Sequence, residues 1–380
     1  MEKKIKKVAN IIEEPRLGGP QLRLLSISSA LQGKIDVTAI LPLKNSKEFQ
    51  LRCDEFKVKY LLSPITTIQR KWITIFKYLI LFPYEIIKLA RLLKKHNFDL
   101  VHVSGGSSQY KGLLAAKLVG IKVIWEMNDS FAPYIIRFIF YFFYKLADSF
   151  IYGSYNTKKY YEKITFKKKS FLIQSPVNTH YFNPKLNYST ERIIKKKIVI
   201  GTVANINPGK DLITFLKVVK KLAKHKNKIF FIIIGSIYES QKKYYKILIS
   251  LIKTYKIKNI KFFNFQKDVR SLLRNIDIYV CCSKYESSPL SVWEAMSMEK
   301  AIVSTNVGDI NKFVNDGING FVVNVGDYSS MADRISKLIS QPKLRRKFGK
   351  YSRQIAIKKL DLKICCNQHI KMYKKVINSI

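Results

Sequence analysis

Short apolar runs alternate with longer amphipathic stretches along most of the chain. Runs rich in β-branched and aromatic residues predict strands in the first half at Val8–Ile12, Val37–Leu41, Lys57–Leu62, Leu100–Val103 and Val123–Glu126. Helical patterns separate most of these runs, at Pro20–Gln32, Thr66–His96 and Gln109–Val119. Strands that alternate with helices in this way predict a parallel sheet with helices on both faces.

The alternation stops at Asn183–Lys197, where Pro, Asn, Ser, Thr and three consecutive lysines replace the apolar runs. It resumes with strand-like runs at Ile198–Val203, Ile229–Ile234, Ile260–Asn264, Ile278–Cys282, Ala301–Ser304 and Gly320–Val323. The pattern predicts an α/β protein with two doubly wound, Rossmann-like domains that face each other across a ligand-binding cleft. The predicted parts are an N-terminal domain at 1–183, a linker at 184–197, a C-terminal domain at 198–362, and a helix at 363–380 that returns to the N-terminal domain.

The composition is that of a folded protein with an unusual charge. Hydrophobic residues make up 47% and charged residues 25%, which excludes a disordered chain. The 69 basic and 26 acidic residues leave a net charge of +43, and the excess is spread over both halves rather than gathered in a basic arm. We interpret the charge as background composition with some attraction to anionic surfaces, and a dedicated basic binding site is the alternative.

The spacing of the cysteines and the apolar segments narrow the class of protein further. The five cysteines include two adjacent pairs, Cys281–Cys282 and Cys365–Cys366, and show no disulfide or zinc spacing, which fits a reducing cytoplasm. Met1–Lys7 is basic, but the apolar run after it is short, so it indicates a first strand rather than a signal peptide. The most apolar segments, 72–93 and 134–151, contain charged residues, so we expect no membrane span.

The densest cluster of candidate chemistry lies at Tyr285–Met296. A buried strand ends just before it, a turn carries Glu286, and Pro289 suits the first position of a helix that carries Glu294. The unpaired N–H groups at such a helix start suit an anionic ligand. The two carboxylates can face one cleft at different depths, where sugar hydroxyls would donate hydrogen bonds to them. Two glutamates on a solvated surface are the alternative.

Four further segments lie at or after strand ends and are candidates for ligand contact. After the first strand of the second half, a Pro-Gly turn places Lys210 beside a helix start, which suits a diphosphate; a surface lysine on a turn is the alternative. Gly18 and Gly19 would let the backbone approach a ligand closely, or form a plain turn. His102 lies at the end of one strand of the first half, where a satisfied strand-end histidine is the alternative. Asp129 lies at the end of the next strand, where a helix cap is the alternative.

These segments together resemble the retaining glycosyltransferases of family 4. The C-terminal motifs that carry the resemblance are Glu286 to Glu294 with Pro289, then Ala301–Asp309 and Asp316–Phe321, preceded by Asp268–Val280. In the N-terminal half the similar segments are Gly18–Gln21, Leu146–Ser154 and Gln174–Pro184. The resemblance spans nearly the whole chain and is weakest at 43–95. It implies the GT-B fold, an arrangement of two Rossmann-like domains.

The resemblance also implies how a sugar donor is held in the C-terminal domain. It implies that Glu294 holds the ribose of a nucleoside diphosphate sugar and that Glu286 holds the transferred sugar. The N–H groups around Leu290 and Ser291 would meet sugar or phosphate oxygens. Ser287 departs from the family, where a Gly is common at this position.

Two basic residues five positions apart usually bind the donor diphosphate in this family. Lys210 matches the Lys, whereas Asn205 stands in the Arg position and can donate a hydrogen bond but brings no charge. The glycine loop of the first domain faces the diphosphate and the acceptor in the family. The remaining assignments are Gly19 to the donor and Gly18 and His102 to the acceptor side. The family often has a sugar-contacting His where Glu126, Asn128 and Asp129 stand here, and we assign to Asp129 a catalytic, sugar-contacting or acceptor-side role beside Glu286 and Lys210.

No metal or separate cofactor is expected. The sequence contains no Asp-x-Asp motif that would hold a metal-bound diphosphate, and no spacing indicates a hydrolase triad. In the family, the departing phosphate is thought to deprotonate the acceptor on the same face of the sugar. The protein then supplies positioning and charge stabilisation rather than a nucleophile.

Two apolar segments with basic neighbours suggest contact with lipid. Their aromatic and aliphatic residues are Trp72, Ile75, Phe76, Leu79, Ile80 and Phe82 in 69–96, and Tyr134, Phe138, Phe140, Tyr141, Phe142, Phe143 and Tyr144 in 134–144. Aromatic side chains beside lysines can rest at a lipid interface. Buried helices of the N-terminal domain are the alternative.

We therefore predict a bacterial, metal-independent, hexosyltransferase-like retaining glycosyltransferase of lipopolysaccharide or capsule synthesis. Its expected partners are a nucleotide sugar, a glycan or lipid-linked acceptor and an anionic membrane surface, with no specific nucleic acid. We expect it in the cytoplasm, with peripheral attachment to the inner face of the plasma membrane as a hypothesis. The alternatives are a catalytically degenerate GT-B protein that acts as a basic nucleic-acid-binding or scaffold module, and a nucleotide-sugar epimerase or hydrolase.

Overall fold

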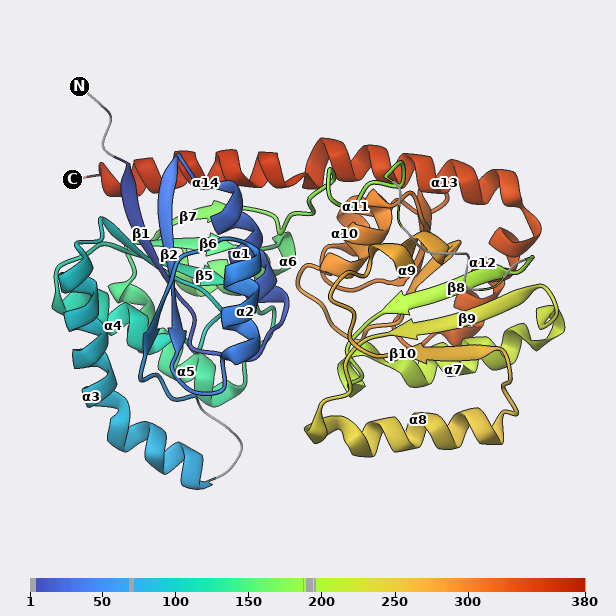
Figure 1. Cartoon of the computed structure of the whole chain (residues 1–380), viewed down its shortest axis with the longest axis horizontal. Helices are drawn as coiled ribbons and strands as arrows, with labels where there is room; N and C mark the ends of the chain where they lie inside the picture. The colour runs from blue at the N-terminus through green and yellow to red at the C-terminus, as the bar shows by residue number, and fades with distance from the viewer. Residues whose placement is uncertain (1–4, 68–71, 187, 189–193, 195, 380) are drawn as a thin grey trace. The chain divides into compact units, whose positions relative to one another are not determined.

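Two compact units make up the chain. The structure is a computed structural model that describes residues 5–67, 72–186, 188, 194 and 196–379 (Figure 1). Unit 1 comprises Met1–Pro176 and Leu362–Ile380, and unit 2 comprises Val177–Asp361. These divisions lie near the limits of 183 and 362 expected from the sequence. The linker expected at 184–197 includes residues 187, 189–193 and 195, which lie outside the described residues, and the rest of it forms turns, bends and irregular backbone.

Unit 1 is built on a 7-stranded parallel sheet in the order β3-β2-β1-β4-β5-β6-β7. Its strands are β1 (Lys6–Ile11), β2 (Ile35–Pro42), β3 (Tyr60–Ser63), β4 (Leu100–Val103), β5 (Val123–Met127), β6 (Ser149–Tyr152) and β7 (Lys169–Leu172). Its helices are α1 (Gly19–Ala30), α2 (Lys47–Glu55), α3 (Trp72–His96), α4 (Tyr110–Leu118), α5 (Tyr134–Phe143), the 3-10 turn η1 (Tyr144–Leu146), α6 (Tyr155–Thr165) and α14 (Leu362–Ile377). Helices link successive strands, as parallel pairing requires.

Unit 2 repeats the plan with a 6-stranded parallel sheet in the order β10-β9-β8-β11-β12-β13. Its strands are β8 (Ile198–Val203), β9 (Ile229–Ile234), β10 (Ile260–Phe263), β11 (Ile278–Cys281), β12 (Ala301–Thr305) and β13 (Gly320–Val323). Its α-helices are α7 (Leu212–Lys221), α8 (Lys242–Thr254), α9 (Arg270–Asn275), α10 (Leu290–Ser297), α11 (Ile310–Phe313), α12 (Tyr328–Ser340) and α13 (Pro342–Ile355). Shorter 3-10 and π turns are η2 (Pro208–Lys210), η3 (Leu222–His225), η4 (Glu239–Gln241) and η5 (Ala356–Leu360).

The strand sequences are continuously apolar because both faces of each sheet are covered. In β9, Phe231 and Ile233 pack into one core cluster, whereas Ile232 and Ile234 pack into the cluster on the opposite face. This alternation follows from the two-residue period of a strand. The two-domain, doubly wound fold predicted from the sequence is therefore confirmed.

Helix α14 completes unit 1 although it comes last in the chain (Figure 1). Its residues Cys366, Met372 and Tyr373 are buried against strand residues that include Val8 and Ile151. The helix presents one apolar stripe to the sheet, because the buried positions recur at helical spacing. Unit 1 is thus built from both ends of the described chain.

Two elements differ from the sequence expectation. Strand β7 reads Lys-Ser-Phe-Leu at the edge of the sheet, where it is half-buried, so no apolar run marks it. Helix α3 begins at Trp72, inside the stretch 66–96 predicted as helical, and residues 68–71 of that stretch lie outside the described residues. Among the described residues, no helix is both long enough and apolar enough to span a bilayer.

Candidate active site

The chain changes direction across the sheet of unit 2 between β8 and β11. From β8 it proceeds outward to β9 and β10, and from β11 it proceeds the other way to β12 and β13. Loops after the carboxyl ends of two such strands diverge and leave a crevice, which is where ligands bind in doubly wound sheets. The loop after β8 carries Lys210, and the loop after β11 carries Glu286.

The loop after β8 is fastened to the loop after β11. Asn207 accepts a hydrogen bond from the Lys210 backbone N–H at 3.3 Å through Oδ1 and so fixes the turn. The backbone N–H of Lys284 donates to the carbonyl oxygen of Gly209 at 2.8 Å. A Cβ on Gly209 would lie 3.0 Å from the ring of Tyr285, so glycine permits this close packing. The two loops therefore hold their side chains in a fixed relation.

Lys210 and Glu286 form an ion pair in this position. Lys210 Nζ lies 2.5 Å from Glu286 Oε1, and the side chains are 29% and 13% exposed. Ser283 donates a second hydrogen bond to the same oxygen at 2.7 Å. Burial lowers the pKa of the Lys210 ammonium, but the Glu286 carboxylate more than offsets this, so the pKa lies above its ordinary value. The Lys210 ammonium therefore stays charged around neutral pH.

Gly308 packs closely against the turn that carries Glu286. This glycine has φ of +53°, and a Cβ there would lie 2.5 Å from the Ser287 carbonyl oxygen and 2.8 Å from that of Glu286. The indole N–H of Trp293 donates to Ser288 Oγ at 3.0 Å. Ser288 thus anchors the turn. Pro289 occupies the N-cap position of α10, one residue before the first helical position expected from the sequence.

The amino end of α10 adds donors and a second carboxyl group. Leu290 and Ser291 are the first two residues of the helix, and backbone N–H groups at such positions have no partner within the helix. Glu294 lies in the following turn. Burial raises the pKa of Glu294 to about 8. Within the described part of the chain, no hydrogen bond or ion pair engages its side chain, so the carboxyl group is available to a ligand.

Asn205 forms a hydrogen bond with the backbone of a neighbouring loop. Its Oδ1 accepts a hydrogen bond from the Ser236 backbone N–H at 3.4 Å, which joins the loops after β8 and β9. These loops lie so close that a Cβ on Gly235 would fall 2.0 Å from the Ala204 carbonyl oxygen. Since Asn205 adds no charge, Lys210 remains the residue in this segment that could neutralise a phosphate.

Gly18 and Gly19 begin α1 in unit 1. Gly18 is the N-cap in an extended conformation, with φ of −154°, that any residue could adopt. A Cβ on Gly19 would meet nothing within 4 Å. A Cβ on Gly18 would lie 3.2 Å from Gln21 Oε1, whereas the space over Gly19 is open.

His102 is buried in a charged network instead of facing solvent. Its Nδ1 lies 2.7 Å from the Tyr373 hydroxyl, and its Nε2 lies 3.1 Å from Glu126 Oε2. Arg23 Nε donates to Glu126 Oε1 at 2.5 Å. Burial would raise the pKa of Glu126, but the Arg23 guanidinium holds it below its ordinary value. The network ties α1, β4, β5 and α14 together inside unit 1.

Asp129 fastens the loop after β4. Its Oδ2 accepts hydrogen bonds from the Ser107 hydroxyl at 2.8 Å and from the Ser107 N–H at 3.3 Å. Gly106 has φ of +98°, and a Cβ there would lie 2.8 Å from Asp129 Cγ. Burial raises the pKa of Asp129. Asp129 is thus held by the loop rather than by a helix start.

The candidate residues divide between the units. Unit 2 brings to one sheet edge the donor-side set Asn205, Lys210, Glu286, Leu290, Ser291 and Glu294, and unit 1 holds Gly18, Gly19, His102 and Asp129. The roles assigned to them stay predictions. The sequence reasoning missed Ser283, Gly308, Arg23 and Tyr373 as individual supports of the sites. An arginine inside the apolar run of α1 was the one available signal.

Comparison with known families covers most of the chain. Residues 17–181 match Glycosyltransferase Family 4, and residues 187–355 match Glycosyl transferases group 1. The chain belongs to the family 4 type of glycosyltransferases. Its two doubly wound units are those of the GT-B fold, as expected from the sequence.

Two relatives that are similar in sequence to this chain are also glycosyltransferases. The N,N'-diacetylbacillosaminyl-diphospho-undecaprenol alpha-1,3-N-acetylgalactosaminyltransferase of Campylobacter jejuni is 24% identical over 78% of this chain and 84% of its own length. The UDP-Gal:alpha-D-GlcNAc-diphosphoundecaprenol alpha-1,3-galactosyltransferase of Escherichia coli is 22% identical over 67% of this chain and 70% of its own.

Two solved structures share the fold over nearly all of both chains. A glycosyltransferase from Rickettsia africae superposes with a TM-score of 0.83 at 18% identity and covers 100% of each chain. Anabaena Alr3699/HepE in complex with UDP and glucose gives a TM-score of 0.83 at 15% identity and covers 97% of this chain and 99% of its own.

Proposed function

We propose that this glycosyltransferase moves a hexose-type sugar from a nucleoside diphosphate to a hydroxyl of a lipid-linked glycan, with retention of the anomeric configuration, in the synthesis of a bacterial surface polysaccharide. The observation that carries the proposal is the ion pair of Lys210 and Glu286 at the sheet edge of unit 2. A cation and a carboxylate held side by side suit a donor that is anionic at its phosphates and rich in hydroxyls at its sugar.

Each group of the site has a role in holding the donor. Lys210 has three N–H donors, so it can contact the diphosphate and keep its bond to Glu286. The open N–H groups of Leu290 and Ser291 at the start of α10 suit the phosphate or sugar oxygens. Glu294 would accept hydrogen bonds from the ribose hydroxyls. The Anabaena protein of the same fold was solved in complex with UDP and glucose, which supports a nucleotide sugar as the donor.

The reaction requires no protein nucleophile in this proposal. The oxygen of the departing phosphate takes the proton from the acceptor hydroxyl on the same face of the sugar, which gives retention. Lys210 and the N–H groups of α10 stabilise the charge that develops on the leaving diphosphate, where fixed donors act most strongly. We propose that this stabilisation makes a metal ion unnecessary.

The relatives support a lipid-linked acceptor. Those of Campylobacter jejuni and Escherichia coli have names that specify diphospho-undecaprenol substrates. An acceptor anchored in a membrane places the enzyme at that surface, and the net charge of +43 favours an anionic one. We therefore propose that the enzyme works as a peripheral protein on the cytoplasmic face of the plasma membrane.

A donor screen followed by a transfer assay tests the proposal. The melting temperature of the enzyme should rise with one nucleoside diphosphate sugar of a panel. That donor should then label a polyprenyl-diphosphate-linked sugar, in the presence of EDTA, with the anomeric configuration retained by NMR. A panel without any thermal shift, together with tight and salt-sensitive nucleic-acid binding, would instead support a degenerate scaffold. Free sugar formed without acceptor would indicate a hydrolase.

A further inference from the structure

Helix α3 exposes a face of large apolar side chains. Its opposite face is buried in unit 1 through residues such as Ile86 and Leu89. Trp72 is 87% exposed and Phe76 is 68% exposed, although solvent-facing helix positions are normally polar. The exposed set recurs at helical spacing and consists of Trp72, Ile73, Phe76, Leu79 and Ile80.

Helix α5 and the loop before it expose a second apolar face. Phe140 is its fully buried residue and packs among the aromatic side chains of Trp125 and Phe150. On the other side, Tyr134 is 75% exposed. The exposed set consists of Phe131 in the loop and Tyr134, Ile135, Phe138, Tyr141 and Phe142 in the helix, where they recur at helical spacing.

The two faces flank the same turn of α4. Tyr110 donates from its hydroxyl to the Ile136 carbonyl oxygen at 3.2 Å and packs against Phe143, both on α5. The next residue, Lys111, places its ammonium 3.9 Å from the ring centroid of Tyr78 on α3. Helices α3 and α5 therefore both contact the first turn of α4, and the two exposed sets belong to helices that pack close together in unit 1.

The charges around this surface have one sign. Residues 72–84 and 130–147 contain no Asp or Glu. Exposed Lys77 lies among the apolar residues of α3, Arg137 lies over the ring of Tyr134 on α5, and Lys145 follows. Basic side chains that border aromatic ones match the acyl-headgroup boundary of an anionic bilayer.

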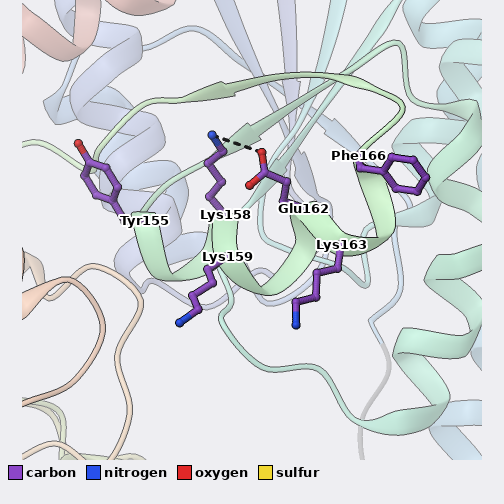
Figure 2. A pocket seen from close by; sticks show the side chains of 6 residues that line it. All are labelled: Tyr155, Lys158, Lys159, Glu162, Lys163 and Phe166. Atoms are coloured by element: carbon purple, nitrogen blue, oxygen red, sulfur yellow. Dashed lines mark ion pairs between the residues drawn. The ribbon is translucent and has the colours of Figure 1, made fainter.

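Helix α6 extends the basic border. The Ala132 N–H, just before α5, donates to the Tyr160 hydroxyl on α6 at 3.3 Å, and the rings of Phe140 on α5 and Tyr161 on α6 pack together, so the two helices meet. Figure 2 shows α6 with the side chains of three lysines, an ion-paired glutamate and two aromatic residues. The residues that line this shallow hollow are Tyr155, Lys158, Lys159, Glu162, Lys163 and Phe166.

We propose that the exposed faces of α3 and α5 form a lipid face that inserts into the headgroup region of an anionic bilayer and holds unit 1 at the membrane. The lipid face consists of the two exposed sets named above. This inference rests on the proposed function only in expecting a membrane-anchored acceptor. A second copy of the chain is the less suitable occupant, since it would bring the same positive charge against this surface.

The native tryptophans provide a direct readout. The chain contains three, and Trp125 and Trp293 are fully buried whereas Trp72 is exposed on the lipid face. Vesicles of phosphatidylcholine and phosphatidylglycerol should shift the emission of the full-length enzyme to the blue. Vesicles of phosphatidylcholine alone should do so less, and Trp72→Phe should abolish the shift. An unchanged emission spectrum with bound vesicles would overturn insertion through α3.

Flotation of the enzyme with the same mixed vesicles tests both helices. We expect the pair Trp72→Ser and Phe76→Ser, and separately the pair Phe138→Ser and Phe142→Ser, to lower the partition coefficient at least about tenfold, since each removes two insertable side chains. The matched control is Leu51→Ser with Leu118→Ser, which removes apolar residues of similar exposure elsewhere on unit 1. The control should bind as the unmodified enzyme does.

Three results would overturn the proposal: lipid-face variants that float as well as the unmodified enzyme, a control that loses binding equally, or a stable dimer in light scattering that the variants dissociate without any vesicle binding. The thermal shift with a nucleotide sugar is measured on every variant. It reports on unit 2 and should not change, so failure of the lipid face and failure of the proposed transferase activity are distinguishable. Unchanged melting temperatures without ligand show that the variants fold.

Discussion

The variant Glu286→Gln should affect binding of the diphosphate and transfer of the sugar differently. Gln keeps the shape of the side chain and can still accept the hydrogen bond that Ser283 donates to Oε1 at 2.7 Å. It removes the negative charge that lies 2.5 Å from Lys210 Nζ. The ammonium is then released from its partner, and a bare nucleoside diphosphate should bind with equal or higher affinity.

The rate of transfer should fall sharply in the same variant. A hydrogen bond to a charged group contributes about 1.5–3 kcal/mol, and its loss in the transition state corresponds to about 10- to 150-fold in rate. The folded state should lose far less. Because Lys210 is 29% exposed, water can solvate its ammonium, and we expect about 1 kcal/mol and a melting temperature lower by about 2–4 °C.

Isothermal titration with UDP and a turnover assay with the donor found in the screen measure the two effects. Lys210→Met is the matched comparison, and it should lose both UDP affinity and turnover. Ser283→Ala should keep the ion pair and lose only a few-fold in rate. Near-normal turnover of Glu286→Gln, or a loss of UDP affinity as large as that of Lys210→Met, would refute the reasoning about this pair.

Three further changes test other parts of the structure. Burial raises the pKa of Glu294 from 4.5 to about 8, so the folded state binds the proton more tightly than the unfolded state does. The free energy of unfolding of the unmodified enzyme should therefore fall as the pH rises from about 4.5 to 8, relative to that of Glu294→Gln. Urea titrations at several pH values measure this difference. Over the same window the affinity for the nucleotide sugar should rise with pH in the unmodified enzyme and stay flat in Glu294→Gln, if ribose hydroxyls bind the ionised form. Gly308→Ala forces a Cβ against the Ser287 carbonyl oxygen at positive φ, so we expect the free energy of urea unfolding to fall by about 1–3 kcal/mol and turnover to fall as well. The control is Gly317→Ala, which has positive φ but open space around it and should lose stability without affecting turnover. Arg23→Met leaves the Glu126 carboxylate buried without its partner and should lower the free energy of unfolding by about 3–5 kcal/mol, while a loss under 1 kcal/mol would show that the network contributes little.

The fold could be predicted because its strands are almost entirely apolar and its connections helical. Runs such as Ile229–Ile234 identify buried parallel strands without any tertiary information. Strand β7 could not be predicted, because its Lys-Ser-Phe-Leu sequence carries no period and becomes a strand only by pairing with β6. The exposure of α3 could not be predicted either, since an apolar helix sequence is compatible with a buried or an exposed face.

The candidate site shows the same division. The acidic pair and Lys210 were accessible to motif reasoning, because strand-end loops place their residues at one sheet edge. The contact between Lys210 and Glu286, and the support that Ser283 gives, depend on how two loops distant in sequence pack together. His102 illustrates the limit from the other side, because its neighbour Tyr373 comes from the last helix, and no local pattern connects them.

The return of α14 to unit 1 bears on how the protein is made. Its side chains at Cys366, Met372 and Tyr373 fill a core whose other half, including Val8 and Ile151, emerges from the ribosome far earlier. The first sheet must therefore wait, with part of its apolar surface uncovered, until synthesis has passed Ile377. Unit 2, whose residues are contiguous from Val177 to Asp361, is under no such delay, and the order of completion along this chain is the reverse of the order of translation.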